Sequence, residues 1–292
     1  METIEGLKKQ MESTSDLSSV VRTMKALSAA SIRQYEEAVE SLDEYSRSIE
    51  LGLQIVMQNS GSNFLVSDDE NQVDMIIVFG SDQGMCGHFN EVIVQYTEEK
   101  LLEFAAQKGN LEVWPVGERL LGALWQRGFS TDQTYNLPSS VDMVNQSVQQ
   151  LLMDIELFRQ RKEIQGIFLF YNSGGGGTLY RQHFEKLWPL DIAWLKSLKE
   201  KEWPARTVPQ IRLLPQQMFQ ALSRQSIYIS LYRAFAESLA AENAGRLVTM
   251  ETAQKNIEER EEELQKRYNQ LRQTSIDNEL FDIIAGFTAL EE

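Results

Sequence analysis

The sequence predicts an antiparallel two-helix coiled coil, made from the N- and C-terminal segments, with a Rossmann-like α/β domain inserted between them. Three observations predict this fold. Both ends of the chain carry apolar or small residues at alternating three- and four-residue steps, the 3.5-residue period of a coiled-coil seam. Both end stretches lack proline. The middle third shows short apolar runs alternating with amphipathic segments, as in an α/β sandwich.

The C-terminal stretch begins just after Pro215 and contains only two glycines, Gly245 and Gly286. At 1.5 Å per residue it would form a helix of roughly 110 Å, too long for a globular domain without a partner helix. Its last turns, Phe281 to Leu290, should extend beyond the partner helix. They should then expose apolar side chains, which indicates a binding surface for another protein. The predicted seam consists of Leu222, Ile229, Tyr232, Ala236, Leu239, Asn243, Met250, Ala253, Ile257, Leu264, Tyr268 and Leu271.

The N-terminal stretch, residues 3 to about 57, supplies the partner helix. The two helices should pair antiparallel, because the inserted domain ties the end of one to the start of the other. The stretch Thr23 to Arg33 is rich in small residues, which indicates either a thin part of the coiled coil or a surface past which something else moves. The predicted seam consists of Ile4, Leu7, Met11, Leu17, Val21, Met24, Tyr35, Val39, Leu42, Ile49, Leu53 and Val56.

The middle third changes period after a turn-forming cluster at Asn59 to Asn63. The near-continuous apolar run at Val73 to Phe79 is typical of a buried parallel strand. The Gly174 to Gly177 run predicts a tight turn between two antiparallel strands. We expect strands at 73–79, 111–116, 166–171 and 178–184, and helices at 90–108, 118–127 and 141–161. The predicted domains are therefore 1–58, 72–208 and 216–292.

Composition excludes several classes of protein. The chain has 43 acidic and 28 basic residues, a formal net charge of −15, whereas nucleic-acid binding needs a basic surface. The single cysteine, Cys86, excludes an internal disulfide and fits a reducing compartment. No apolar run reaches the length of a membrane span, and no signal-peptide pattern follows Met1. We expect a soluble protein that faces the cytoplasm.

Candidate chemistry is sparse. The loop Gly80 to Gly87 lies between a strand and a helix, where phosphates bind in α/β folds, but it matches neither a P-loop nor a dinucleotide fingerprint. A structural turn is the preferred interpretation. Cys86 and His88 are too close in sequence for nucleophile–base geometry, and with His183 they form no convincing metal cluster. The acidic run Glu258 to Glu263 is typical of a solvated helix face. We expect no catalytic residue, cofactor or metal.

Three groups of residues match the pattern of one known family. The run Val21 to Ala30 is similar to that family's N-terminal stretch of lysine, alanine, methionine and small residues. Ser81 to Gly87 resembles its serine-aspartate-arginine-glycine-leucine-cysteine-glycine signature. The most specific match is C-terminal and comprises Leu231–Glu242, Arg246, Met250, Tyr268–Gln273, Ile276, Glu279–Leu280, Ile283 and Ala285–Gly286. With these three matches the chain resembles the gamma subunits of rotary F-type ATP synthases.

Departures from the family pattern are also present. Gln83 replaces the signature arginine, His88 replaces the second glycine after the cysteine, and Asp277-Asn278 replaces a threonine-glutamine pair. The acidic balance and these changes resemble a divergent, alternate-type member.

The resemblance implies a central-stalk rotor that couples ion flow to ATP synthesis or hydrolysis at the beta subunits and is itself non-catalytic. Implied partners are the alpha and beta subunits around the shaft, the epsilon subunit and the membrane ring of c subunits. The implied location is peripheral, on the cytoplasmic face of the cell membrane. The positions that match family subunit contacts, or that belong to the exposed tip, are Met24, Lys25, Arg272, Gln273, Asp277, Phe287 and Leu290.

Two other classes remain open from the residues alone. The chain would also suit a coiled-coil scaffold or tether whose α/β domain binds a ligand, with the rod solvated rather than enclosed by subunits. An α/β enzyme that uses Cys86 or the loop after Phe79 would show turnover by the isolated chain.

Overall fold

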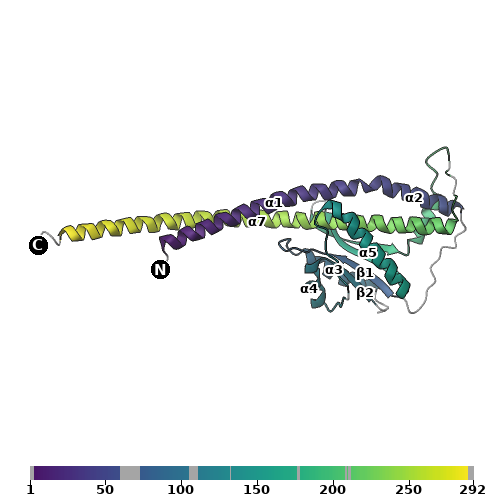
Figure 1. Cartoon of the computed structure of the whole chain (residues 1–292), viewed down its shortest axis with the longest axis horizontal. Coiled ribbons are helices and arrows are strands. Elements are labelled where there is room, and N and C mark those ends of the chain that lie inside the picture. Colours follow the sequence, from purple (N-terminus) through teal and green to yellow (C-terminus); the bar gives the residue numbers. More distant parts are fainter. Residues whose placement is uncertain are drawn as a thin grey trace. The chain divides into compact units, whose positions relative to one another are not determined.

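The computed structural model describes residues 3–59, 73–104, 111–131, 133–175, 178–207, 209 and 212–288. The chain divides into two compact units, one made of Met1–Ser28 with Arg246–Glu292 and the other of Ala29–Gly245. Two helices, α1 and α7, contribute to both units (Figure 1). The elements are α1 (Ile4–Glu40), α2 (Leu42–Asn59), β1 (Val73–Phe79), α3 (Phe89–Phe104), β2 (Leu111–Val116), α4 (Glu118–Gln126), α5 (Val141–Arg161), β3 (Ile164–Gly175), β4 (Thr178–Trp188), α6 (Ile192–Glu200) and α7 (Pro215–Thr288).

The unit 29–245 contains a four-stranded sheet in the order β2-β1-β3-β4. Strands β1, β2 and β3 run parallel, and β4 pairs antiparallel with β3, so both predicted orientations are confirmed. Strand β4 continues to Trp188, four residues beyond the predicted end. The additional residues pair with β3, where Trp188 lies opposite Ile167. The periodicity of a single strand does not reveal how far its pairing with a neighbour extends.

Both faces of this sheet are covered, because alternate residues of β1 point to opposite sides. Met75, Ile77 and Phe79 belong to a core with residues of α5 and α7. Ile76 and Val78 belong to a second core with residues of α3 and α4. Figure 1 shows α3 and α4 on the side of the sheet away from α7. This two-sided burial explains why β1 reads as a continuous apolar run.

Within the same unit, α2 and α7 pack against a helix that periodicity did not predict. This helix, α6, has nine residues and begins where the Asp191 side chain accepts a hydrogen bond from the Ala193 amide at 2.8 Å. Leu195 and Leu198 of α6 are buried against residues of α2 and α7, including Leu53 and Phe219. One apolar face on so short a helix is a weak sequence signal, and tertiary burial stabilises it.

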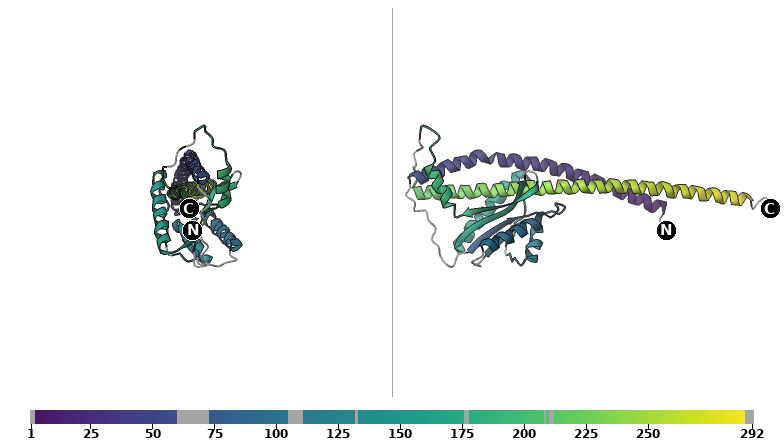
Figure 2. Two further views of the ribbon diagram at one scale, coloured as in Figure 1. Left: turned by 90° about the vertical axis from the view of Figure 1, so that its right-hand side faces the viewer. Right: turned by 180° about the vertical axis from the view of Figure 1, so that it is seen from behind.

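The unit made of residues 3–28 and 246–288 is a pair of antiparallel helical segments (Figure 2). Val21 of α1 forms a buried cluster with Met250 and Ile257 of α7. Leu264, seven residues after Ile257, is 1% exposed. The heptad seam predicted for this part of α7 is therefore confirmed.

One predicted seam residue is wrong. Leu17 is 53% exposed, whereas the neighbouring seam positions Thr14 and Ser18 are half-buried. Counting in steps of three and four from the buried Leu7 passes through residues 11, 14, 18 and 21 and misses Leu17 by one residue. The small polar residues Thr14 and Ser18 occupy the seam here. The prediction chose Leu17 because it is the apolar residue next to them.

Candidate functional site

The loop between β1 and α3 is a packed structural turn, as its spacing favoured. The Asn90 side chain accepts a hydrogen bond from the Ser81 amide at 3.0 Å, and Asp82 accepts bonds from the amides of Glu118 and Leu137, both at 2.8 Å. Cys86 is buried with Phe89, Ala241 and Tyr180. The loop's polar groups are therefore used to join β1 to α3, α4 and the segment before α5.

Helix α7 approaches this loop at a glycine. A Cβ atom added to Gly245 would lie 2.8 Å from the carbonyl oxygen of Cys86, which is closer than such atoms tolerate. Gly245 therefore lets the backbone of α7 pass against the loop. Its role explains why a glycine occurs inside a long helix, where it otherwise lowers stability.

Met24 and Lys25 lie on the α1 segment that pairs with α7. Met24 packs against the cluster of Val21, Met250 and Ile257. The Lys25 ammonium lies 3.4 Å from a carboxylate oxygen of Glu251 and donates a hydrogen bond to the Gln254 side chain at 3.5 Å. Lys25 is thus held by α7 at the surface of the helix pair, while the Met24 side chain anchors the same turn.

The small residues around these two positions lie on different sides of α1. Ser28 is buried, as a thin coiled-coil seam requires, whereas Ala26, Ala29 and Ala30 are exposed. One stripe of the small residues therefore faces inward. The three alanines lie on the exposed side of α1, together with Leu27, which is 64% exposed.

Arg272, Gln273 and Asp277 are all exposed on α7. Within the described residues, neither Arg272 nor Asp277 takes part in a salt bridge. Positions 272 and 277 are about 140° apart around a helix of 3.6 residues per turn, so their side chains diverge. No ion pair therefore joins Arg272 to Asp277 in the described part of the chain.

The structure does not bring the predicted contact residues together as one site. Arg272 follows Gln254, the hydrogen-bond partner of Lys25, by 18 positions, or about 27 Å along α7 at 1.5 Å per residue. Phe287 belongs to α7, and Leu290 lies outside the described residues. Met24 with Lys25, and Arg272 with Gln273, are thus separate contact candidates.

The described end of α7 carries a group of exposed apolar side chains, with Phe281 67% exposed. The last buried seam residue is Leu264, and the described side chains from Ile276 onward are all exposed. Isolated exposed apolar residues are ordinary, but a contiguous group indicates a protein contact. The group comprises Ile276, Leu280, Phe281, Ile283 and Ile284.

Alongside the last part of the seam, α7 has an acidic outer surface. Arg260 pairs with Glu263 at 3.0 Å and Lys266 with Glu262 at 3.9 Å, all on exposed side chains. Pairs of this kind contribute about 0–1 kcal/mol each, which fits the predicted solvated face. In the described part of the chain, no three His, Cys, Asp or Glu side chains are placed to hold a metal ion. No described helix is long and apolar enough to cross a membrane.

Sequence comparison covers the whole length of this architecture. The family model described as ATP synthase matches residues 3–290. The ATP synthase gamma chain of Sulfurimonas denitrificans is 25% identical over 305 residues and covers 100% of both chains. That of Chlorobium phaeobacteroides is 26% identical over 302 residues, covering 100% of this chain and 99% of its own.

Solved structures share the fold. The rotor of the Euglena gracilis mitochondrial ATP synthase contains a chain with a TM-score of 0.63 and 16% identity, covering 94% of this chain and 98% of its own. A chain of the Tetrahymena thermophila mitochondrial ATP synthase central stalk and c-ring has a TM-score of 0.54 and 18% identity, covering 80% and 99%. The full-length family match, supported by this common fold, shows that the chain belongs to the ATP synthase family as a gamma-chain member.

Proposed function

We propose that this central-stalk subunit couples ion flow through a membrane rotor to ATP synthesis or hydrolysis at the beta subunits of an F-type complex. The observation that carries the proposal is the asymmetric surface of α7. A buried seam ends at Leu264 and is followed by exposed apolar residues up to Ile284. Such a surface suits a shaft whose tip is enclosed by other subunits. Because the surface is asymmetric, a rotating shaft presents different side chains to each surrounding subunit.

The proposed partners are alpha and beta subunits around the shaft, an epsilon subunit and the membrane ring of c subunits. In this arrangement the segments 1–58 and 216–292 form the shaft, and 72–208 forms the domain outside the ring of catalytic subunits. The chain is proposed to be non-catalytic and to need no cofactor, with the nucleotide chemistry in the beta subunits. The complex is proposed to sit on the cytoplasmic face of the cell membrane.

The proposed contacts to the catalytic ring fall at two levels of the shaft. Met24 and Lys25 form the lower one, next to the exposed alanines Ala26, Ala29 and Ala30. Arg272, Gln273 and Asp277 form the upper one, and we propose Phe287 and Leu290 as further contact residues. A guanidinium keeps its charge and offers five directed donors, which suits a contact that must form at one angle and release at the next.

Co-expression of the full chain with the alpha and beta subunits of its own source tests this function. We expect a stable complex that hydrolyses ATP, and no turnover by the full chain alone. A chain that stays free of both subunits would favour the tether alternative, in which the rod is solvated. Turnover by the isolated chain would instead favour an α/β enzyme.

Replacing Cys86 with serine tests whether the loop has chemistry of its own. The thiol donates to two oxygens of its own loop, Ser81 Oγ at 3.6 Å and the Gln83 carbonyl at 3.7 Å, and serine can retain such bonds. We expect ATP hydrolysis by the assembled complex to change less than twofold. A large loss of hydrolysis with assembly intact would show a functional thiol.

A further inference from the structure

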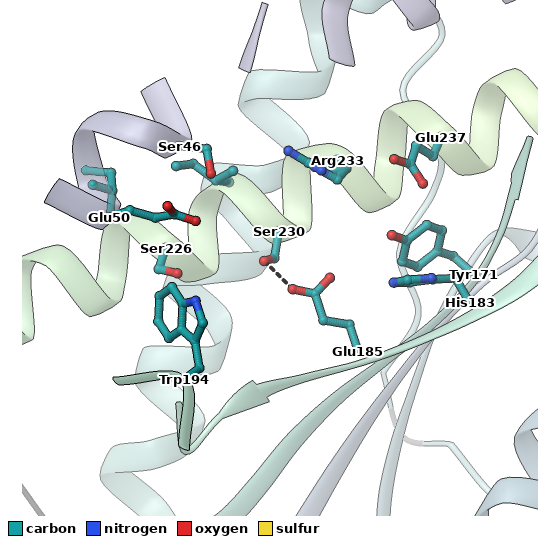
Figure 3. Close-up of a pocket in the computed structure, with 12 residues that line it drawn as sticks. Ser46, Glu50, Tyr171, His183, Glu185, Trp194, Ser226, Ser230, Arg233 and Glu237 are labelled. Carbon is teal, nitrogen blue, oxygen red and sulfur yellow. Dashed lines mark hydrogen bonds between the residues drawn. The ribbon is translucent and has the colours of Figure 1, made fainter. Parts of the chain in front are cut away.

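A polar cavity of about 260 Å³ lies within the unit 29–245, between three helices and the β3–β4 pair (Figure 3). Helices α2, α6 and α7 each contribute to its walls. Its size is near the lower end for ligand sites, which suits a small molecule or a single side chain. The residues that the following argument uses are Glu50, Glu185, Trp194, Ser226, Arg233 and Glu237.

The cavity carries more negative charge than its own cation balances. Three carboxylates line it, Glu50, Glu185 and Glu237, with one guanidinium, Arg233. Arg233 also lies 3.3 Å from Asp43, outside the cavity lining. Burial raises the pKa of Glu237, and the nearby positive groups of Arg233 and His183 oppose that rise.

Glu50 and Glu185 are the other two carboxylates of the cavity. Glu185 accepts a hydrogen bond from the Ser230 hydroxyl at 2.6 Å, which does not neutralise its charge. No salt bridge among the described residues includes Glu50 or Glu185. Both side chains are half-buried, so their charges are screened less than those of surface carboxylates. A concave wall of this kind concentrates negative potential.

The indole ring of Trp194 also lines the cavity. Figure 3 shows the Trp194 indole and the Glu50 carboxylate on either side of the Ser226 hydroxyl, with Glu185 beyond them. Tryptophan is the most favourable aromatic partner for an ammonium or guanidinium group. Hydroxyl and carboxylate oxygens accept the hydrogen bonds that such groups donate. No described cluster of acidic or histidine side chains has a metal-holding arrangement, which favours an organic cation.

We infer that this cavity binds an ammonium or guanidinium group between Trp194 and the carboxylates of Glu50 and Glu185. The group has two sources, a free small cation or a lysine side chain of a neighbouring subunit in the assembled complex. Every residue of the proposed site belongs to the unit 29–245. The inference therefore does not depend on whether the chain rotates inside a complex.

Calorimetric titration of the full chain with agmatine tests the free-ligand source. Agmatine carries both a guanidinium and an ammonium group, and butylurea provides an uncharged probe of similar shape. We expect saturable agmatine binding at 1:1 and none of butylurea. Glu50→Gln keeps the side-chain shape and should weaken binding at least fivefold. Glu44→Gln removes the same charge from an exposed position of α2 and should leave binding unchanged.

Carbodiimide coupling in the assembled complex tests the second source, because it links a carboxylate to a lysine that touches it. A cross-link from Glu50 or Glu185 to a lysine of another subunit, absent in the corresponding glutamine variant, would assign the cavity to that side chain. The inference is overturned if agmatine does not bind the full chain and no such cross-link forms. It is equally overturned if Glu50→Gln and Glu44→Gln weaken agmatine binding to the same extent. Neither result bears on assembly with alpha and beta subunits.

Discussion

Replacing Leu264 with alanine is expected to lower the free energy of unfolding of the paired α1 and α7 segments by about 2 kcal/mol. Buried leucine-to-alanine changes cost about 2–5 kcal/mol, and the lower end applies because solvent flanks a two-helix seam. Leu264 is 1% exposed, so the change removes nearly its full buried side chain. Urea unfolding of the full chain, followed by circular dichroism, measures the effect.

Leu17→Ala is the matched control, because it removes the same atoms from a leucine that is 53% exposed. It should change the free energy of unfolding by less than about 0.5 kcal/mol, the usual range for surface substitutions. Equal losses in the two variants would contradict the seam register described above. A structure in which Leu264 pairs only between two copies of the chain would contradict the intrachain helix pair.

Replacing Arg272 with alanine is expected to lower coupled ATP synthesis or hydrolysis about tenfold while the complex still assembles. Hydrogen bonds to charged groups contribute about 1.5–3 kcal/mol, and each 1.36 kcal/mol of lost transition-state stabilisation is a factor of ten in rate. Arg272 has no salt bridge within the described part of the chain, so its guanidinium is available to another subunit. Turnover of the purified complex at saturating nucleotide measures the effect.

Two other variants separate a special role from a general loss of charge. Lys25→Ala should have a smaller effect than Arg272→Ala, because part of the lysine's bonding goes to Glu251 and Gln254 of its own chain. Arg260→Ala removes an exposed arginine from the acidic face and should leave turnover unchanged. Wild-type turnover in Arg272→Ala would leave the shape and apolar tip of the shaft as the transmitting features.

The period of the sequence by itself determined the architecture. Steps of three and four residues marked both long helices, since a seam in any helix pair must repeat at that interval. The apolar runs located β1 and β2 at the bounds that the structure has, whereas β3 and β4 each end four residues beyond the predicted end. The specific residues from Leu231 to Gly286 carried the resemblance that the family match confirms.

Only the tertiary structure decided the remaining features. Where small polar side chains line the seam, the heptad pattern does not show which of two adjacent residues faces the partner helix. Ser28, for example, is buried, whereas the adjacent Leu27 is exposed. Helix α6 forms because α2 and α7 bury its two leucines. The cavity with Glu50, Glu185 and Trp194 joins elements far apart in the chain, and no spacing within one element reveals it. Local periodicity records which side of a helix is buried, whereas a site between elements exists only once they pack.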